Sequence, residues 1–93
     1  MIVRVCVRVV IRGIVQGVLF RASMSEVARS NKVDGWVRNR GDGGVEALLE
    51  GEDRDVRQVL DWAEHGPRRA RVDSVAVERQ SRLHGLRGFR IMG

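Results

Sequence analysis

The amino-acid sequence predicts an α+β fold in which two helices cover one face of an antiparallel β-sheet. Its 93 residues suffice for one hydrophobic core and not for two. Hydrophobic residues make up 43% of the chain and charged residues 31%, the balance of a folded globular protein rather than of a disordered or membrane-spanning one. Stretches with the strand period of two alternate with stretches of helical spacing. We therefore expect residues 1–93 to form a single domain.

The first strand and the first helix are predicted by a change in the spacing of apolar residues. Between positions 3 and 12, apolar and mostly polar residues alternate, with Val3, Val5, Val7, Val9 and Ile11 set against Arg4, Cys6, Arg8, Val10 and Arg12. This alternation is typical of a strand with one buried face and one open face. After a glycine-bounded loop, an amphipathic helix is indicated by the apolar residues Phe20, Met24, Val27 and Ala28.

The rest of the chain predicts a hairpin, a second helix and further strands. Two alternating segments, 33–40 and 45–50, flank turn-forming residues at 39–44. Residues 51–67 begin with acidic side chains, continue with apolar residues at helical spacing and end with Gly66-Pro67, as a helix does. Residues 72–79 are rich in β-branched side chains, and 89–91 could add a short final strand. The order β-α-β-β-α-β is that of the ferredoxin-like sandwich.

The sequence predicts neither a membrane span nor a disulfide nor a zinc site. Its apolar runs fall far below the roughly 18 residues of a spanning helix, and the first residues lack the layout of a signal peptide. Cys6 is the single cysteine, and the two histidines, His65 and His84, lie in different segments. We expect a cytoplasmic protein with no membrane partner.

The formal net charge of +5 favours an anionic partner, and the loop before the first helix is the best candidate site for one. The excess charge is almost wholly arginine, whose planar guanidinium suits phosphate and carboxylate groups. Gly13 and Gly17 permit backbone angles that can aim several N–H groups at one anion, and Arg21 follows within the first helical turn. From spacing alone, a simple tight connection is the commoner explanation of two such glycines.

Two longer motifs resemble those of the acylphosphatase family. The first motif is Gly13-Ile14-Val15-Gln16-Gly17-Val18-Leu19-Phe20-Arg21, and the second is Gly35-Trp36-Val37-Arg38-Asn39 followed by Gly43, Val45 and Gly51. The similarity extends through His65-Gly66-Pro67 to Gly88-Phe89-Arg90-Ile91 and so covers nearly the whole chain. It implies a ferredoxin-like fold and hydrolysis of acyl phosphates, with Arg21 binding phosphate and Asn39 positioning water.

Two positions depart from the family pattern. Ile14 replaces a residue that is commonly polar or basic, and Leu19 replaces a frequent glycine. Neither position supplies a catalytic side chain, so we expect these residues to alter the shape of the pocket or the rigidity of the loop.

The chemistry of an acyl phosphate explains why few groups would suffice. Its leaving group is a carboxylate, whose conjugate acid has a pKa of about 4, so it departs without a strong general acid. Phosphoryl transfer needs mainly positioning and charge stabilisation, which Arg21 and backbone N–H groups can provide without Mg²⁺. The N–H donors that we expect to line the cradle belong to Val15, Gln16, Gly17, Val18, Leu19 and Phe20.

Asn39 can hold a water in line with the phosphorus but is no base at neutral pH. We therefore hypothesise that the proton of the water passes to a phosphoryl oxygen of the substrate. The expected partners are a small acyl phosphate and, in the same cradle, phosphate or other anions. No metal or other cofactor is expected.

An RRM-like nucleic-acid-binding module is the main alternative, because it shares the β-α-β-β-α-β order and the chain is basic. The basic open face of the sheet would be its platform, with Trp36 as a stacking side chain. Against it, the paired aromatic residues of the RNA-binding signature are absent, and Glu46 and Glu50 can pair across strands with the arginines. We expect no specific nucleic-acid partner. A third alternative is a regulatory or carbamoyl-phosphate-handling module of the same fold.

Several side chains keep two interpretations. Gln16 either lines the pocket or caps the turn. Cys6, between two arginines, is either a tolerated small residue or a reactive thiol with a lowered pKa. For Phe20 and Trp62, on or beside the helical apolar stripes, core packing is the favoured role.

Overall fold

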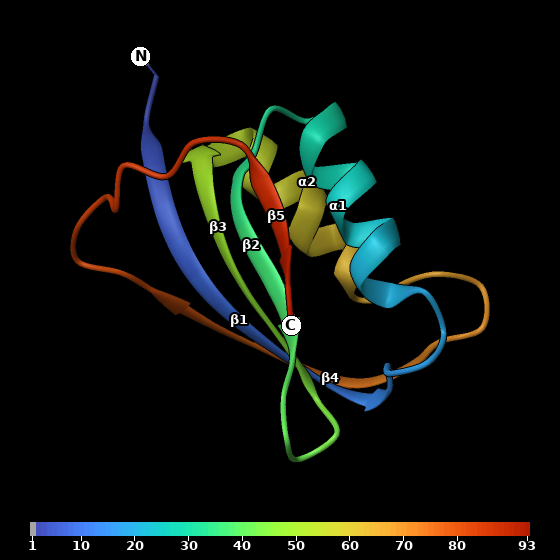
Figure 1. The fold of residues 1–93 in the computed structure, drawn as a ribbon. Helices are drawn as coiled ribbons and strands as arrows, with labels where there is room; N and C mark the ends of the chain where they lie inside the picture. Colours follow the sequence, from blue (N-terminus) through green and yellow to red (C-terminus); the bar gives the residue numbers. More distant parts are fainter. Residues whose placement is uncertain (1) are drawn as a thin grey trace.

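The computed structural model describes residues 2–93, in which two helices lie on one face of a five-stranded sheet (Figure 1). In chain order the elements are β1 (Arg4–Ile14), α1 (Phe20–Ser30), β2 (Asp34–Asn39), β3 (Val45–Glu52), α2 (Asp53–Ala63), β4 (Arg71–Arg79) and β5 (Phe89–Met92). The strand order across the sheet is β4-β1-β3-β2-β5. The predicted ferredoxin-like sandwich is confirmed.

The last strand adds a feature that the sequence did not specify. The pairs β1–β3, β1–β4 and β2–β3 are antiparallel, as expected, whereas β5 pairs with β2 in parallel. Since β4 and β5 form opposite edges of the sheet, residues 80–88 must cross from one edge to the other. We refer to residues 80–88 as the crossing loop.

The core lies between the sheet and the helices, at the positions that the periodicity predicted. Six of its side chains, two each from β1, α1 and α2, are 0% exposed: Val9, Ile11, Met24, Ala28, Val59 and Ala63. Helix α1 packs against β2 and β5, whereas α2 packs against β3 and β1. Burial of this apolar surface stabilises the fold by roughly 25 cal/mol per Å², and it fixes the first turn of α1 close to β2 and β5.

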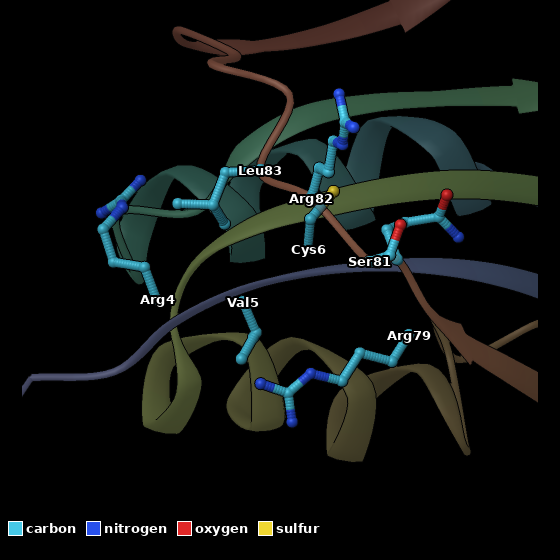
Figure 2. Close-up of a pocket in the computed structure, with 8 residues that line it drawn as sticks. Arg4, Val5, Cys6, Arg79, Ser81, Arg82 and Leu83 are labelled. Carbon is cyan, nitrogen blue, oxygen red and sulfur yellow. The ribbon is translucent and has the colours of Figure 1, made fainter.

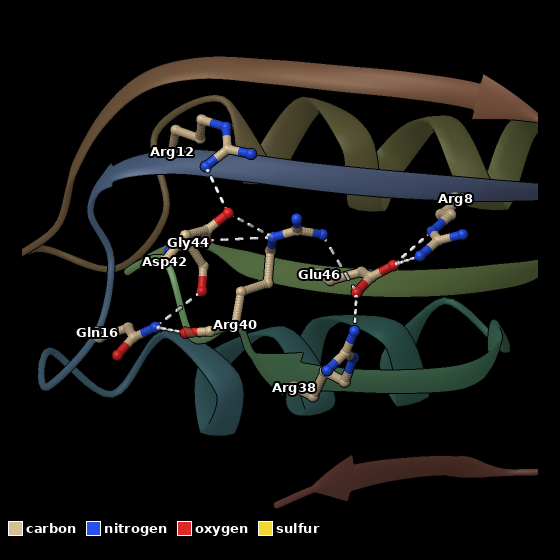
Figure 3. A network of polar contacts seen from close by, with 8 residues as sticks. All are labelled: Arg8, Arg12, Gln16, Arg38, Arg40, Asp42, Gly44 and Glu46. Atoms are coloured by element: carbon tan, nitrogen blue, oxygen red, sulfur yellow. Dashed lines mark hydrogen bonds and ion pairs between the residues drawn. The ribbon is translucent and has the colours of Figure 1, made fainter.

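Glu46 lies at the centre of a cluster of arginines on the open face of the sheet (Figure 3). Its fully buried carboxylate accepts hydrogen bonds from Arg8 and Arg38, and Nη1 of Arg40 lies 3.4 Å from its Oε1. Burial alone would raise the pKa of Glu46, but the hydrogen bonds and charges of Arg8 and Arg38 outweigh it and lower the pKa below its ordinary value. The predicted cross-strand pairing is confirmed for this glutamate.

Glu50 and Cys6 lie on the same face but differ from expectation. The carboxylate of Glu50 accepts backbone N–H groups of His84, Gly85 and Leu86 in the crossing loop, and within residues 2–93 it forms no ion pair with an arginine. The crossing loop therefore covers this part of the face. Cys6 is only 1% exposed, and burial together with the charge and hydrogen bond of Glu50 raises the pKa of its thiol to about 11. The interpretation of Cys6 as a low-pKa reactive thiol is wrong.

The lowered pKa of Glu46 predicts how stability changes in acid. Because the folded state holds the carboxylate ionised, its contribution is complete above the ordinary pKa of 4.5 and is lost as the pH falls below that value. Glu46→Gln should lower the melting temperature at pH 7 by roughly 4–8 °C, which corresponds to about 1 kcal/mol. The loss is moderate because Arg8 and Arg38, whose side chains are about half exposed, can be solvated by water in the variant. Thermal unfolding between pH 7 and pH 2 should show this difference shrinking. If the difference in melting temperature between Glu46→Gln and the parent stayed constant over that pH range, the carboxylate of Glu46 would not have the lowered pKa described here.

Candidate active site

The loop between β1 and α1 carries a run of backbone N–H groups without hydrogen-bond acceptors in the described part of the chain. Its residues Gly17 and Leu19 have left-handed backbones, with φ of 74° and 64°. Helix α1 begins without a side-chain N-cap and without an acidic residue in its first turn. Within residues 2–93, the N–H groups of residues 15–22 have no hydrogen-bond acceptor. The helix N-terminus adds a partial positive charge, so the loop is suited to an anion.

A pocket of about 310 Å³ opens beside this loop. The residues that line it come from the loop, α1, the end of β2 and β5: Val15, Gly17, Leu19, Phe20, Arg21, Ala22, Asn39 and Ile91. The structure thus brings the predicted Arg21 and Asn39 together in one pocket, although 18 positions separate them in the sequence. Their shared place in the lining allows both side chains to contact one ligand in the pocket.

Arg21 is held from one side and left free on the other. Its Nη1 donates a hydrogen bond to the carbonyl oxygen of Met92 in β5, at 3.1 Å. Within residues 2–93, its other guanidinium N–H groups have no acceptor, so they remain available to an anion in the pocket. A guanidinium anchored to the backbone loses less conformational freedom when it binds a phosphate fork-to-fork.

Asn39 is the last residue of β2 and pairs with Val45 across the hairpin. Its side chain is partly buried and has no hydrogen-bond partner within the described part of the chain. The amide can therefore both donate to and accept from a ligand in the pocket. Strand pairing on one side of the residue and the turn on the other hold its backbone in place.

Gln16 ties the loop to the hairpin, which settles the choice left open by the sequence. Its Nε2 donates to the carbonyl oxygens of Arg40 and Gly44 at 2.8 and 2.9 Å (Figure 3). Those two residues also pair directly, N–H of Arg40 to carbonyl of Gly44, at 2.8 Å. The side chain therefore caps the turn that follows Asn39 instead of lining the pocket.

Asp42 braces the same turn. It accepts a hydrogen bond from the backbone N–H of Gly44 at 3.1 Å, and its carboxylate contacts the guanidinium groups of Arg12 and Arg40 (Figure 3). The Gly44 N–H, followed by Arg12, lowers the pKa of Asp42 to about 2. The turn is thus held by an ionised side chain throughout the neutral pH range. Because Gln16 ties the loop to this turn, the position of the loop relative to Asn39 is fixed.

The remaining predicted loop residues divide into two groups. Val15, Gly17, Leu19 and Phe20 line the pocket, although the ring of Phe20 is buried and packs against the ring of Trp62 in a tilted arrangement, at a centroid distance of 5.2 Å. The predicted core role of both rings is confirmed. Val18 packs against the core and is not part of the lining.

Two residues of the lining were not predicted from the sequence. Ala22 lies one residue past Arg21 on α1, and Ile91 reaches the pocket because β5 pairs in parallel with β2, with Val37 opposite Ile91. The position of Ala22 could have been inferred from its place after Arg21. Ile91 had no local signal, since only the pairing of distant strands brings it there.

A second hollow of about 400 Å³ lies beside the N-terminal part of β1 and the crossing loop (Figure 2). It is lined by Arg4, Cys6, Arg79 and Arg82, among others, but the guanidinium groups point in different directions. It lacks the convergent donors of the first pocket. Within residues 2–93, no three His, Cys, Asp or Glu side chains are grouped so as to hold a metal ion, and no helix is long and apolar enough to cross a membrane.

Comparisons with known proteins find similarity to acylphosphatases over most of the chain. The family model described as acylphosphatase matches residues 7–91. The acylphosphatase of Pyrobaculum aerophilum is 52% identical to this chain over 85 residues, 90% of each protein. That of Pseudomonas paraeruginosa is 49% identical over 86 residues, 92% of this chain and 93% of the relative. The crystal structure of acylphosphatase from Bacillus subtilis matches with a TM-score of 0.93 at 32% identity, over 96% of this chain and 99% of that one.

Proposed function

The chain belongs to the acylphosphatase family, and we infer that it hydrolyses acyl phosphates to a carboxylate and inorganic phosphate in the pocket between α1 and β2. The observation that carries this inference is that Arg21 and Asn39 line one pocket together with residues of the loop before α1, whose backbone N–H groups have no acceptor within residues 2–93. We propose that residues 1–93 act as one acylphosphatase-like domain.

The phosphoryl group is bound by the loop and by Arg21. Backbone N–H groups of residues 15–20 and the free N–H groups of the guanidinium donate to the non-bridging oxygens, where negative charge is concentrated in the transition state. These donors are in place before substrate arrives, since Gln16 and Met92 hold the two parts of the cradle. Inorganic phosphate and similar anions bind in the same place.

Water attacks phosphorus in line, positioned by Asn39. The amide oxygen accepts a hydrogen bond from the water, while the amide nitrogen can donate to the substrate. The bond from phosphorus to the carboxyl oxygen breaks as the new bond from the water oxygen forms, and the electron pair leaves with the carboxylate. The proton of the water passes to a phosphoryl oxygen, so no protein base and no metal ion is needed.

The nucleic-acid-binding alternative has little to support it. Glu46 pairs with three of the open-face arginines, and the crossing loop covers the face at Glu50. Trp36, its supposed stacking platform, is partly buried and pairs in register with the buried Leu48. None of the similarities described above is to a nucleic-acid-binding module. A cytoplasmic location remains a prediction.

Release of inorganic phosphate from acetyl phosphate or benzoyl phosphate tests the proposal. The purified chain should catalyse it equally with and without EDTA. Ordinary phosphate monoesters should stay largely intact because an alkoxide is a much poorer leaving group than a carboxylate. A rate that disappears with EDTA and returns with Mg²⁺ would refute the metal-free mechanism, and a chain that cleaves no acyl phosphate would refute the function.

A further inference from the structure

Leu19 is an exposed leucine in a backbone conformation that leucine disfavours. Its side chain is 76% exposed, and its φ of 64° lies in the left-handed region, where a side chain meets the following carbonyl and glycine does not. It adds nothing to the hydrophobic core. An unfavourable backbone together with an unburied apolar side chain needs an explanation outside folding.

Leu19 lies at the pocket, and it has an apolar counterpart there. Ile91 of β5 also lines the pocket and is 49% exposed. Among the eight lining residues, Arg21 is the only charged one and Asn39 the only other polar side chain. In the proposed function, Arg21 binds the phosphoryl group and Asn39 positions the water. The surface left for the acyl part of a substrate is therefore apolar.

We propose that Leu19 and Ile91 form the acyl-binding wall of the pocket, and that the enzyme prefers acyl phosphates with an apolar acyl chain over those whose chain ends in a charged group. The inference rests on the proposed function. An aliphatic chain laid against the two side chains removes apolar surface of both partners from water. A chain that ends in a carboxylate would lose hydration there without gaining an ionic partner.

Three substrates measure this preference. Acetyl phosphate has almost no acyl chain, hexanoyl phosphate has an apolar one, and adipoyl monophosphate has the same six carbons with a terminal carboxylate. We expect kcat/KM for hexanoyl phosphate to exceed that for adipoyl monophosphate by about 10-fold or more, since each methylene buried contributes roughly a factor of 4.

Leu19→Gly and Lys32→Gly make a matched pair, because Leu19 and Lys32 are the two non-glycine residues of the described chain with positive φ. Glycine relieves the same backbone strain at both positions, so both variants should melt at or up to about 5 °C above the parent. Only Leu19→Gly should lower the ratio of kcat/KM for hexanoyl phosphate to that for acetyl phosphate, by roughly 5-fold. Ile91→Ala should lower the same ratio, and Leu19→Met should preserve it.

The ratio separates specificity from catalysis. A looser loop in Leu19→Gly would slow hydrolysis of every substrate alike and leave the ratio unchanged. An unchanged ratio in Leu19→Gly, or equal use of hexanoyl phosphate and adipoyl monophosphate by the parent, would overturn the acyl-binding wall while leaving acyl phosphate hydrolysis intact. Failure of the parent to hydrolyse any of the three would instead overturn the proposed function.

Discussion

Arg21→Ala is expected to lower kcat/KM for acyl phosphates by at least about 100-fold, the usual effect of removing one preorganised donor from a transition state. Inhibition by inorganic phosphate should weaken with it, because the same guanidinium grips the oxygens of substrate, transition state and product. Steady-state kinetics with phosphate as a competitive inhibitor measures both effects. Arg21→Lys should recover little activity, since an ammonium group lacks the bidentate geometry.

Arg29→Ala supplies the control for this variant. Arg29 lies on the same helix and also bonds the backbone of β5, with its Nη2 donating to the carbonyl oxygen of Phe89 at 3.0 Å, but it does not line the pocket. The Arg29→Ala variant should lose about as much stability as Arg21→Ala, because each variant loses one hydrogen bond to the backbone of β5. Unlike Arg21→Ala, it should keep its affinity for phosphate. Phosphate inhibition that is equally strong in Arg21→Ala and in the parent would place the guanidinium outside the cradle.

Much of the fold follows from local periodicity. The alternation from Val3 to Arg12 predicts β1, and the spacing of Phe20, Met24 and Ala28 predicts α1, because each pattern repeats the geometry of its own element. Helix α2 begins at Asp53, as its acidic first turn suggested. That Arg21 and Asn39 lie in one pocket was predicted in a different way, through the resemblance of two motifs to those of a known family. Nothing in the local sequence indicates that the two residues share a pocket.

What escaped prediction depends on contacts between distant segments. Glu50 has the same strand parity as Glu46, and only the path of the crossing loop gives it three backbone donors instead of an arginine. Burial of Cys6, together with the charge and hydrogen bond of Glu50, raises the pKa of its thiol, where the neighbouring arginines had suggested the opposite. Ile91 enters the pocket through strand pairing that 89–91 alone could not specify. For Gln16, the sequence offered two roles, and the position of the hairpin decided between them.

Asn39→Ala should reduce kcat by about 1,000-fold with KM nearly unchanged, because it removes the group that orients water and leaves the phosphate-binding groups in place. Its melting temperature should stay close to that of the parent, since the Asn39 side chain has no hydrogen-bond partner within residues 2–93. Single-turnover and steady-state kinetics separate the two parameters. A raised KM with unchanged kcat would assign Asn39 to substrate binding instead.

Asn39→Asp distinguishes a positioning role from a basic one. Aspartate keeps an acceptor for water, so a base at this position would retain activity. It also places a negative charge beside a dianionic phosphoryl group, which weakens substrate binding and repels the charge that develops in the transition state. If Asn39 only positions water, the aspartate variant should be at least as impaired in kcat as the alanine variant and should have a higher KM. A kcat close to that of the parent, with a new acidic limb in the pH profile, would show that a carboxylate can take the proton there and that proton transfer to the substrate is not the route.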